Sequence, residues 1–181
     1  MTMTEDLVPA LATMTDEIRA VVNQGLSEAG TGEAVASVIS NYVHQETLLR
    51  PEHRVGDPER YKQHILHVEP DGSFSIVSLV WLPGQETAIH DHVSWCVVGV
   101  HEGEESEERF TAVEDNGESH LRLVGTGTNP EGLVVWLSPP GDIHRVTNTD
   151  TKTTISIHVY GADISVLGTS IRREYELPIK A

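Results

Sequence analysis

The feature that most constrains this chain is a pair of histidines, His90 and His92, that one residue separates and that His144 follows later in the sequence. Side chains alternate between the two faces of a β-strand, so His90 and His92 would project to the same side of a single strand. A third imidazole comes from His144, which follows a Pro-Pro-Gly turn at 139–141 and opens a strand-like run. Imidazoles are common ligands of transition metals. This spacing predicts a β-barrel that holds a three-histidine metal centre with open coordination positions.

Hydrophobic periodicity divides the chain into a helical part and a β part. Helical signals occupy residues 5–50, where Thr15-Asp16-Glu17 is typical of a helix start and apolar residues recur at helical spacing. From Tyr61 onward the period changes to two, and clusters of Pro, Gly, Asn and Asp separate short runs. We predict strands at residues 65–68, 74–82, 95–100, 119–124, 133–137, 144–147 and 153–160. Many short strands with frequent turns favour a β-sandwich or a closed barrel.

Length and charge bound the architecture and the class of partner. A chain of 181 residues suits one domain. We expect a helical segment at 1–58 and a barrel at 59–181. The formal net charge of -16 repels phosphate backbones and anionic lipid surfaces, so neither nucleic acid nor a membrane is expected as a partner. Part of this charge lies in the acidic run 102–108, which we expect to be a solvated loop.

The sequence also carries compartment signals. No stretch approaches the roughly 20 apolar residues that span a bilayer, and the first residues lack the basic start of a signal peptide. The single cysteine, Cys96, excludes an internal disulfide and fits a reducing compartment. We therefore expect a cytoplasmic protein.

The spacing of these residues resembles the two sequence motifs of the cupin superfamily. Gly84, His90 and His92 match the first motif, and residues 139–148 contain the second. The glutamate that usually completes a four-ligand cupin site would fall at Cys96, so the resemblance implies three neutral histidine ligands. It also implies a mainly β fold, a jelly-roll-like cupin β-barrel preceded by α-helices.

Within the cupins, residues 61–175 resemble the thiol dioxygenases, the group of cysteine dioxygenase and bacterial 3-mercaptopropionate dioxygenase. The run Ser156-x-His158-x-Tyr160 is similar to that family's catalytic serine, histidine and tyrosine triad. The resemblance implies an Fe(II) enzyme that uses O2 to oxidise a small carboxylated thiol to its sulfinic acid. The donor set agrees, because three neutral ligands leave Fe(II) its full positive charge, which favours an anionic thiolate, and leave positions open for O2.

The substrate-binding residues point to one branch of this family. Cysteine dioxygenases hold the substrate carboxylate with an arginine in a Tyr-x-Arg-Asn segment, whereas here the corresponding run begins at Tyr61 and has Gln63 in place of the arginine. This departure resembles the mercaptopropionate branch, which implies a carboxylate-binding arginine near the C-terminus, aligned with Arg173 and secondarily with Arg172. We expect 3-mercaptopropionate as the favoured substrate and cysteine as the next.

Cys96 carries a separate hypothesis. Animal cysteine dioxygenases have a cysteine that becomes bonded to the triad tyrosine, whereas the mercaptopropionate branch usually has glycine. We hypothesise that iron and O2 oxidise Cys96 and Tyr160 to a thioether. In the alternative interpretation, Cys96 is a small buried hydrophobic residue.

Two other classes of function fit the same metal motif. Three histidines and a water also make a zinc hydrolytic site, and a cupin without activity can bind a small ligand. The Ser-His-Tyr run counts against the zinc interpretation, and the lack of an appended DNA-binding segment counts against a sensor. In the corresponding structural interpretation, Ser156, His158 and Tyr160 are only the polar lining of a strand, and Arg172 and Arg173 are a solvated pair.

Overall fold

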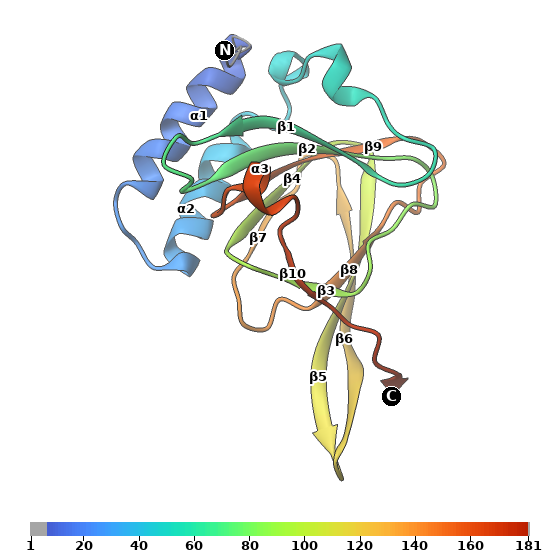
Figure 1. Cartoon of the computed structure of the whole chain (residues 1–181). Helices are drawn as coiled ribbons and strands as arrows, with labels where there is room; N and C mark the ends of the chain where they lie inside the picture. The colour runs from blue at the N-terminus through green and yellow to red at the C-terminus, as the bar shows by residue number, and fades with distance from the viewer. Residues whose placement is uncertain (1–6, 181) are drawn as a thin grey trace.

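The computed structural model describes residues 7–180, in which two helices come first and strands follow (Figure 1). The helices are α1 (Pro9–Val22), α2 (Glu28–Ser40) and α3 (Ile164–Leu167), and the 3-10 turns are η1 (Glu46–Leu48) and η2 (Pro51–Arg54). The strands are β1 (Lys62–Val68), β2 (Ser75–Trp81), β3 (His90–His92), β4 (Cys96–Glu102), β5 (Glu104–Asp115), β6 (Glu118–Pro130), β7 (Val134–Leu137), β8 (His144–Thr147), β9 (Thr154–Tyr160), β10 (Ile171–Glu174) and β11 (Ile179–Lys180). No helix within residues 7–180 is long and apolar enough to cross a bilayer.

The strands form two sheets. One has five strands in the order β1-β2-β9-β4-β7, and the other has six in the order β10-β3-β8-β5-β6-β11. Figure 1 shows β5 and β6 continuing as a long ribbon beyond the body of the two sheets. The expected mainly β cupin fold with N-terminal helices is confirmed. The closed barrel is not, because no pairing among the described strands joins one sheet to the other.

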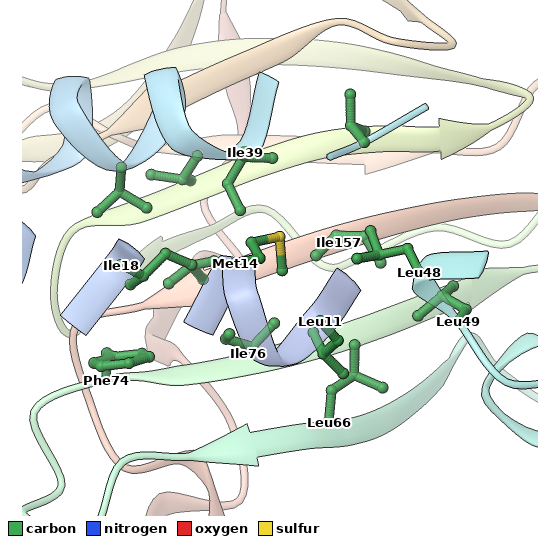
Figure 2. Packing of buried hydrophobic residues seen from close by; sticks show 14 of the residues in the cluster. Leu11, Met14, Ile18, Ile39, Leu48, Leu49, Leu66, Phe74, Ile76 and Ile157 are labelled. Atoms are coloured by element: carbon green, nitrogen blue, oxygen red, sulfur yellow. The ribbon is translucent and has the colours of Figure 1, made fainter. Parts of the chain in front are cut away.

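Helices α1 and α2 cover the outer face of the five-stranded sheet. Their apolar residues recur at helical spacing and so form one stripe, which packs on the sheet. Figure 2 shows this core, which includes Leu11, Met14, Ile18, Ile39, Leu66, Phe74, Ile76 and Ile157. Burying one such side chain contributes roughly 1.5–3 kcal/mol. The helices therefore cover one face of the five-stranded sheet and leave the other face free to line the candidate site.

Strand β9 lies between β2 and β4, and all of its seven residues are buried. Its isoleucines and valine at odd positions belong to the core under the helices. By alternation, Ser156, His158 and Tyr160 point the other way, into the space between the two sheets. One strand thus supplies both the packing of the outer core and a polar row for the interior.

The sequence-based helix start was wrong. Helix α1 begins at Pro9 rather than at Thr15. Proline suits the first position of a helix, because the backbone N–H that it lacks would have no partner within the helix there. Thr15 lies inside the helix, where its hydroxyl donates to the Leu11 carbonyl at 2.8 Å. Each of the seven predicted strands overlaps an observed strand. Residues 1–6 of the predicted helical segment and residue 181 of the predicted barrel lie outside the described residues.

The acidic run was also misassigned. Residues 104–108 open the long strand β5, which pairs with β6 on one side and β8 on the other. Glu105 is only 1% exposed. Charge suggested solvent, but a strand between two partners must turn alternate side chains inward whatever their polarity. The run is therefore part of the inner wall of the fold, and not a solvated loop.

Candidate metal centre

Strands β3 and β8 place the three predicted histidines around one point. His90 and His92 lie on the same face of β3, and His144, the first residue of β8, is the cross-strand partner of His90. The ring centroids are 4.9 Å apart for His90 and His92, 4.7 Å for His90 and His144, and 5.0 Å for His92 and His144. One ligand nitrogen from each ring lies within 4.8 Å of the other two, and all three residues are buried. The sheet thus brings these rings together around space for one metal ion.

The Nδ1 atom of each ring has its own partner. His90 Nδ1 donates to the Ala88 carbonyl at 2.9 Å. His92 Nδ1 lies 3.0 Å from an Asp142 carboxylate oxygen, and His144 Nδ1 lies 2.7 Å from one of Glu107. These acceptors place a proton on each Nδ1, so the lone pair of each Nε2 is directed elsewhere. Such outer hydrogen bonds orient rings that bind a metal.

The protonation states also fit a metal. Burial, together with the neighbouring imidazoles, lowers the pKa of His90 to about 3, and burial lowers the pKa of His92 as well. Burial works against ionisation of Glu107 and Asp142, but hydrogen bonds from His144 and His92 bring the pKa of each carboxyl below its usual value. Neutral imidazoles beside anionic acceptors form a set of nitrogen donors that suits a divalent transition metal.

The predicted triad forms a continuous hydrogen-bonded row on β9. Ser156 Oγ lies 2.9 Å from His158 Nε2, and the Tyr160 hydroxyl lies 3.0 Å from His158 Nδ1. The indole N–H of Trp81 donates to Ser156 Oγ at 3.2 Å. The Tyr160 ring lies beside His92, with 6.3 Å between ring centroids. The row therefore ends next to the three histidines.

One pocket is lined both by the three histidines and by His158 and Tyr160 of the triad. It contains two of the predicted substrate-binding residues, Tyr61 and Gln63. The Tyr61 ring stacks on Trp81 at 4.4 Å, and Gln63 donates to the Gly168 carbonyl at 3.4 Å. The other lining residues are Leu79, Trp81, Thr87, Val98, Val146, Thr169, Ser170 and Ile171, with the three histidines, His158 and Tyr160. The described lining therefore contains no lysine or arginine.

The structure does not bring Arg172 and Arg173 to this pocket. Both guanidinium groups bond to Asp91, which lies between the two β3 histidines and faces the opposite side of the strand. Their side chains are 48% and 59% exposed. Thr169 and Ser170 line the pocket instead, because α3 and a bulge in the β10–β3 pairing set the register of this segment. Their placement does not support the expected guanidinium anchor.

Cys96 lies directly opposite Tyr160 in the β4–β9 pairing, and both side chains are buried. Burial raises the pKa of the Cys96 thiol well above its usual value. The two residues of the cross-link hypothesis are thus neighbours across the sheet.

Sequence reasoning missed three residues of the site: Glu107, Asp142 and Trp81. Asp142 stands two residues before His144 in the Pro-Gly-Asp turn, so its position was visible but its contact with His92 was not. Glu107 was hidden in the run taken for a loop. Had that run been assigned as a strand, alternation would have placed Glu105 and Glu107 on one inward face.

Comparison with known sequences gives a family match and a relative. The profile of the family described as cysteine dioxygenase type I matches residues 1–168. Cysteine dioxygenase type 1 of Danio rerio is 27% identical over 106 residues, which make up 58% of this chain and 52% of that protein. The match therefore spans about half the length of that relative.

Solved structures with a similar fold include two bacterial proteins. An uncharacterised conserved protein with a double-stranded β-helix domain from Klebsiella pneumoniae is 18% identical, with 62% of this chain and 85% of that chain covered and a TM-score of 0.46. An RmlC-like cupin protein from Desulfovibrio desulfuricans is 23% identical, with 59% and 88% covered and a TM-score of 0.42. These likenesses concern the fold alone.

The first prediction concerns the carboxylate behind His144. Replacing Glu107 with alanine should weaken binding of a divalent transition metal by roughly 10- to 100-fold, because the ring of His144 loses its orienting acceptor. Competition titration against a chelator measures this affinity. Glu108→Ala is the matched control, since Glu108 pairs with Arg145 instead of a histidine ligand. Equal affinities of the two variants would contradict the assignment.

Proposed function

We propose, because the chain belongs to the cysteine dioxygenase type I family, that it oxidises a small thiol with O2 to the sulfinic acid, using Fe(II) held by His90, His92 and His144. One observation carries this proposal: three buried imidazoles with their Nδ1 atoms engaged share a single pocket with a Ser-His-Tyr row. The imidazoles suit a metal that must bind a thiolate, and the row suits hydrogen bonding to what binds there.

When bound, Fe(II) supplies a centre at which a thiolate and O2 meet and exchange electrons. The three histidines add no negative charge to that centre, so they favour the anionic thiolate over the neutral thiol. Leu79, Val98 and Val146 line the pocket with apolar surface. In such surroundings the hydrogen bonds made by polar residues are stronger than in water.

The row of Ser156, His158 and Tyr160 on β9 supplies hydrogen-bonding groups to the site. Burial raises the pKa of Tyr160 well above its usual value, so the phenol keeps its proton. Burial also lowers the pKa of His158 to about 3, so the ring is neutral and passes hydrogen bonds without carrying charge. His158 and Tyr160 of the row both line the pocket, and Tyr160, beside His92, can contact a ligand there.

The proposed function predicts thiol-dependent oxygen uptake by protein loaded anaerobically with Fe(II), with one sulfinate formed for each O2 consumed. An oxygen electrode and chromatography of the product measure both quantities. His144→Ala is the control and should show neither. Absence of oxygen uptake by the iron-loaded protein, together with hydrolysis by the zinc-loaded protein, would favour a hydrolytic cupin, and ligand binding without turnover would favour a binding module.

The role of the row predicts a kinetic effect without loss of metal. Tyr160→Phe should retain iron but lose roughly 10- to 100-fold in sulfinate formation, because an outer hydrogen bond to the reacting groups is removed. The ratio of sulfinate to O2 reports the coupling of the reaction. Tyr42→Phe, at a tyrosine whose hydroxyl bonds to Glu17 on the outside, is the matched control. An unchanged rate and coupling in Tyr160→Phe would reduce the row to strand lining.

For the substrate we propose a small carboxylated thiol, with 3-mercaptopropionate favoured over cysteine. Gln63 and Tyr61 line the pocket and supply an amide and a phenol, both able to donate to a carboxylate. The arginines of the original prediction bond to Asp91 instead. We therefore assign carboxylate binding to these uncharged donors.

This assignment predicts that Gln63→Ala raises KM for 3-mercaptopropionate by roughly 10-fold or more, since a hydrogen bond to a charged group contributes about 1.5 to 3 kcal/mol. KM for cysteamine, which has no carboxylate, should barely change. Arg173→Ala should leave both constants near the original values, because the Arg173 guanidinium contacts Asp91 outside the pocket and Arg172 still pairs with that carboxylate. The reverse pattern, with Arg173 critical and Gln63 neutral, would restore the guanidinium anchor.

The pairing of Cys96 with Tyr160 supports the thioether hypothesis. Residues directly opposite in antiparallel strands have Cβ atoms about 4.5 to 5.5 Å apart. Joining the sulfur to the tyrosine ring is a two-electron oxidation that removes two hydrogen atoms, with O2 as oxidant. Iron-loaded protein that has turned over in air should show this mass loss, and Cys96→Ala should not. A Cys96 that alkylates fully after denaturation would eliminate the cross-link.

A further inference from the structure

The interior holds a carboxyl group that the proposed function leaves unused. Glu105, near the start of β5, is 1% exposed, and its Oε1 atom has no hydrogen-bond partner among the described residues. A buried carboxylate with an unmatched oxygen is costly. The burial of Glu105 with one oxygen unmatched is therefore a feature that its surroundings must offset.

Glu105 extends the row on β9. The Ser156 side chain lies close enough to the Glu105 carboxyl group to lower its pKa by hydrogen bonding, and Ser170 acts on the Tyr160 hydroxyl in the same way at the other end. With the contacts of His158 to both neighbours, a single line of hydrogen bonds runs from Glu105 to Tyr160 at the pocket. Glu105 is the only member of this line that changes charge in the neutral pH range, since His158 and Tyr160 keep their uncharged forms there.

The single proton of the Ser156 hydroxyl makes the line directional. Trp81 already donates to Ser156 Oγ, which leaves that oxygen one further acceptor site and one donor. If Glu105 is ionised, Ser156 donates to it and accepts from His158 Nε2–H, so Nδ1 of that ring accepts from Tyr160. If Glu105 is protonated, it donates to Ser156, Ser156 donates to Nε2, and Nδ1–H donates to the Tyr160 oxygen. Each arrangement satisfies all three sites of Ser156.

We propose that Glu105 is a positioning residue whose protonation sets the direction of the Ser156–His158–Tyr160 row. A protonated Glu105 frees the Tyr160 hydroxyl hydrogen to donate into the metal pocket. An ionised Glu105 turns that hydrogen toward His158 and leaves the pocket facing only a phenol oxygen that accepts. The protonation state of Glu105 and the direction of the Tyr160 O–H bond are thus linked through the tautomer of the neutral His158 ring.

The surroundings of Glu105 make this exchange accessible near neutral pH. Burial, opposed in part by the hydrogen bond from Ser156, raises the pKa of Glu105 to about 7. The titratable groups that interact with it are Glu107 on its own strand, Cys96 on β4 and Tyr160 on β9. Its cross-strand partner on β6, Asn129, carries no charge. A rise in pH through this value would therefore remove the donor from the pocket.

The direct test is the tautomer of His158, followed by ¹⁵N NMR of the histidine rings in the full-length protein loaded with diamagnetic zinc. We expect the proton to move from Nδ1 to Nε2 as pH rises through about 7. Glu105→Gln, which has the same shape but does not titrate, should hold one tautomer at every pH. Glu105→Met should hold Nδ1–H, because Ser156 then has only His158 to donate to. Glu104→Gln, on the outer side of the same strand, is the control and should switch like the parent.

A pH-independent tautomer in the parent protein, or a switch that persists in Glu105→Gln, would overturn the proposal. A second measurement rests on the proposed function: kcat/KM for thiol oxidation should fall roughly 3- to 10-fold above the transition in the parent, and stay flat in Glu105→Gln. The NMR measurement requires neither thiol nor O2. Absence of thiol oxidation with an intact tautomer switch would therefore count against the dioxygenase assignment and not against the role of Glu105.

Discussion

The alternation of side chains along β9 is the constraint on which the rest of the structure depends. The strand is paired on both edges, so its backbone hydrogen bonds are satisfied and its position is fixed between β2 and β4. One face completes the core beneath α1 and α2, and the other carries Ser156, His158 and Tyr160. A shift of one residue in its register would place isoleucines beside the three histidines and polar groups under the helices. The packing of one face of β9 under the helices thus also determines which side chains its other face presents to the interior.

The candidate metal centre depends in turn on the groups that hydrogen-bond to its histidines. The rings of His92 and His144 are oriented by carboxylates, and the ring of His90 by a backbone carbonyl. Asp142 also accepts from the backbone N–H of His92 at 3.0 Å. It therefore fixes both the strand and the ring that the strand carries. A centre built in this way needs no movement of its ligands to bind an ion, because the acceptors have already selected the tautomer of each ring.

Sequence patterns predicted the parts of the molecule that rest on local rules. The His90-x-His92 spacing, the polar face of β9 and the positions of seven strands follow from alternation alone. Two segments show where local rules end. The run around Glu105 was taken for a loop, because its charge suggested solvent while its pairing with β6 and β8 is decided by residues far along the chain. Arg173 was aligned to the pocket, but its position depends on α3 and the β10 bulge, which no local pattern reports.

Glu105 and Glu107 show how one strand shifts the pKa values of two carboxyl groups in opposite directions. Alternation places both on the inward face of β5, two residues apart. Burial opposes ionisation of each carboxyl group. Glu107 accepts a hydrogen bond from the Nδ1–H of His144, which lowers its pKa. Glu105 has the hydroxyl of Ser156 as its partner instead, and its pKa rises to about 7. The charge on Glu107 also disfavours a second charge at Glu105. Pairs of acids separated in this way commonly divide the tasks of a site. Here Glu107 orients His144, one of the proposed metal ligands, and Glu105 is left to control the row that faces it.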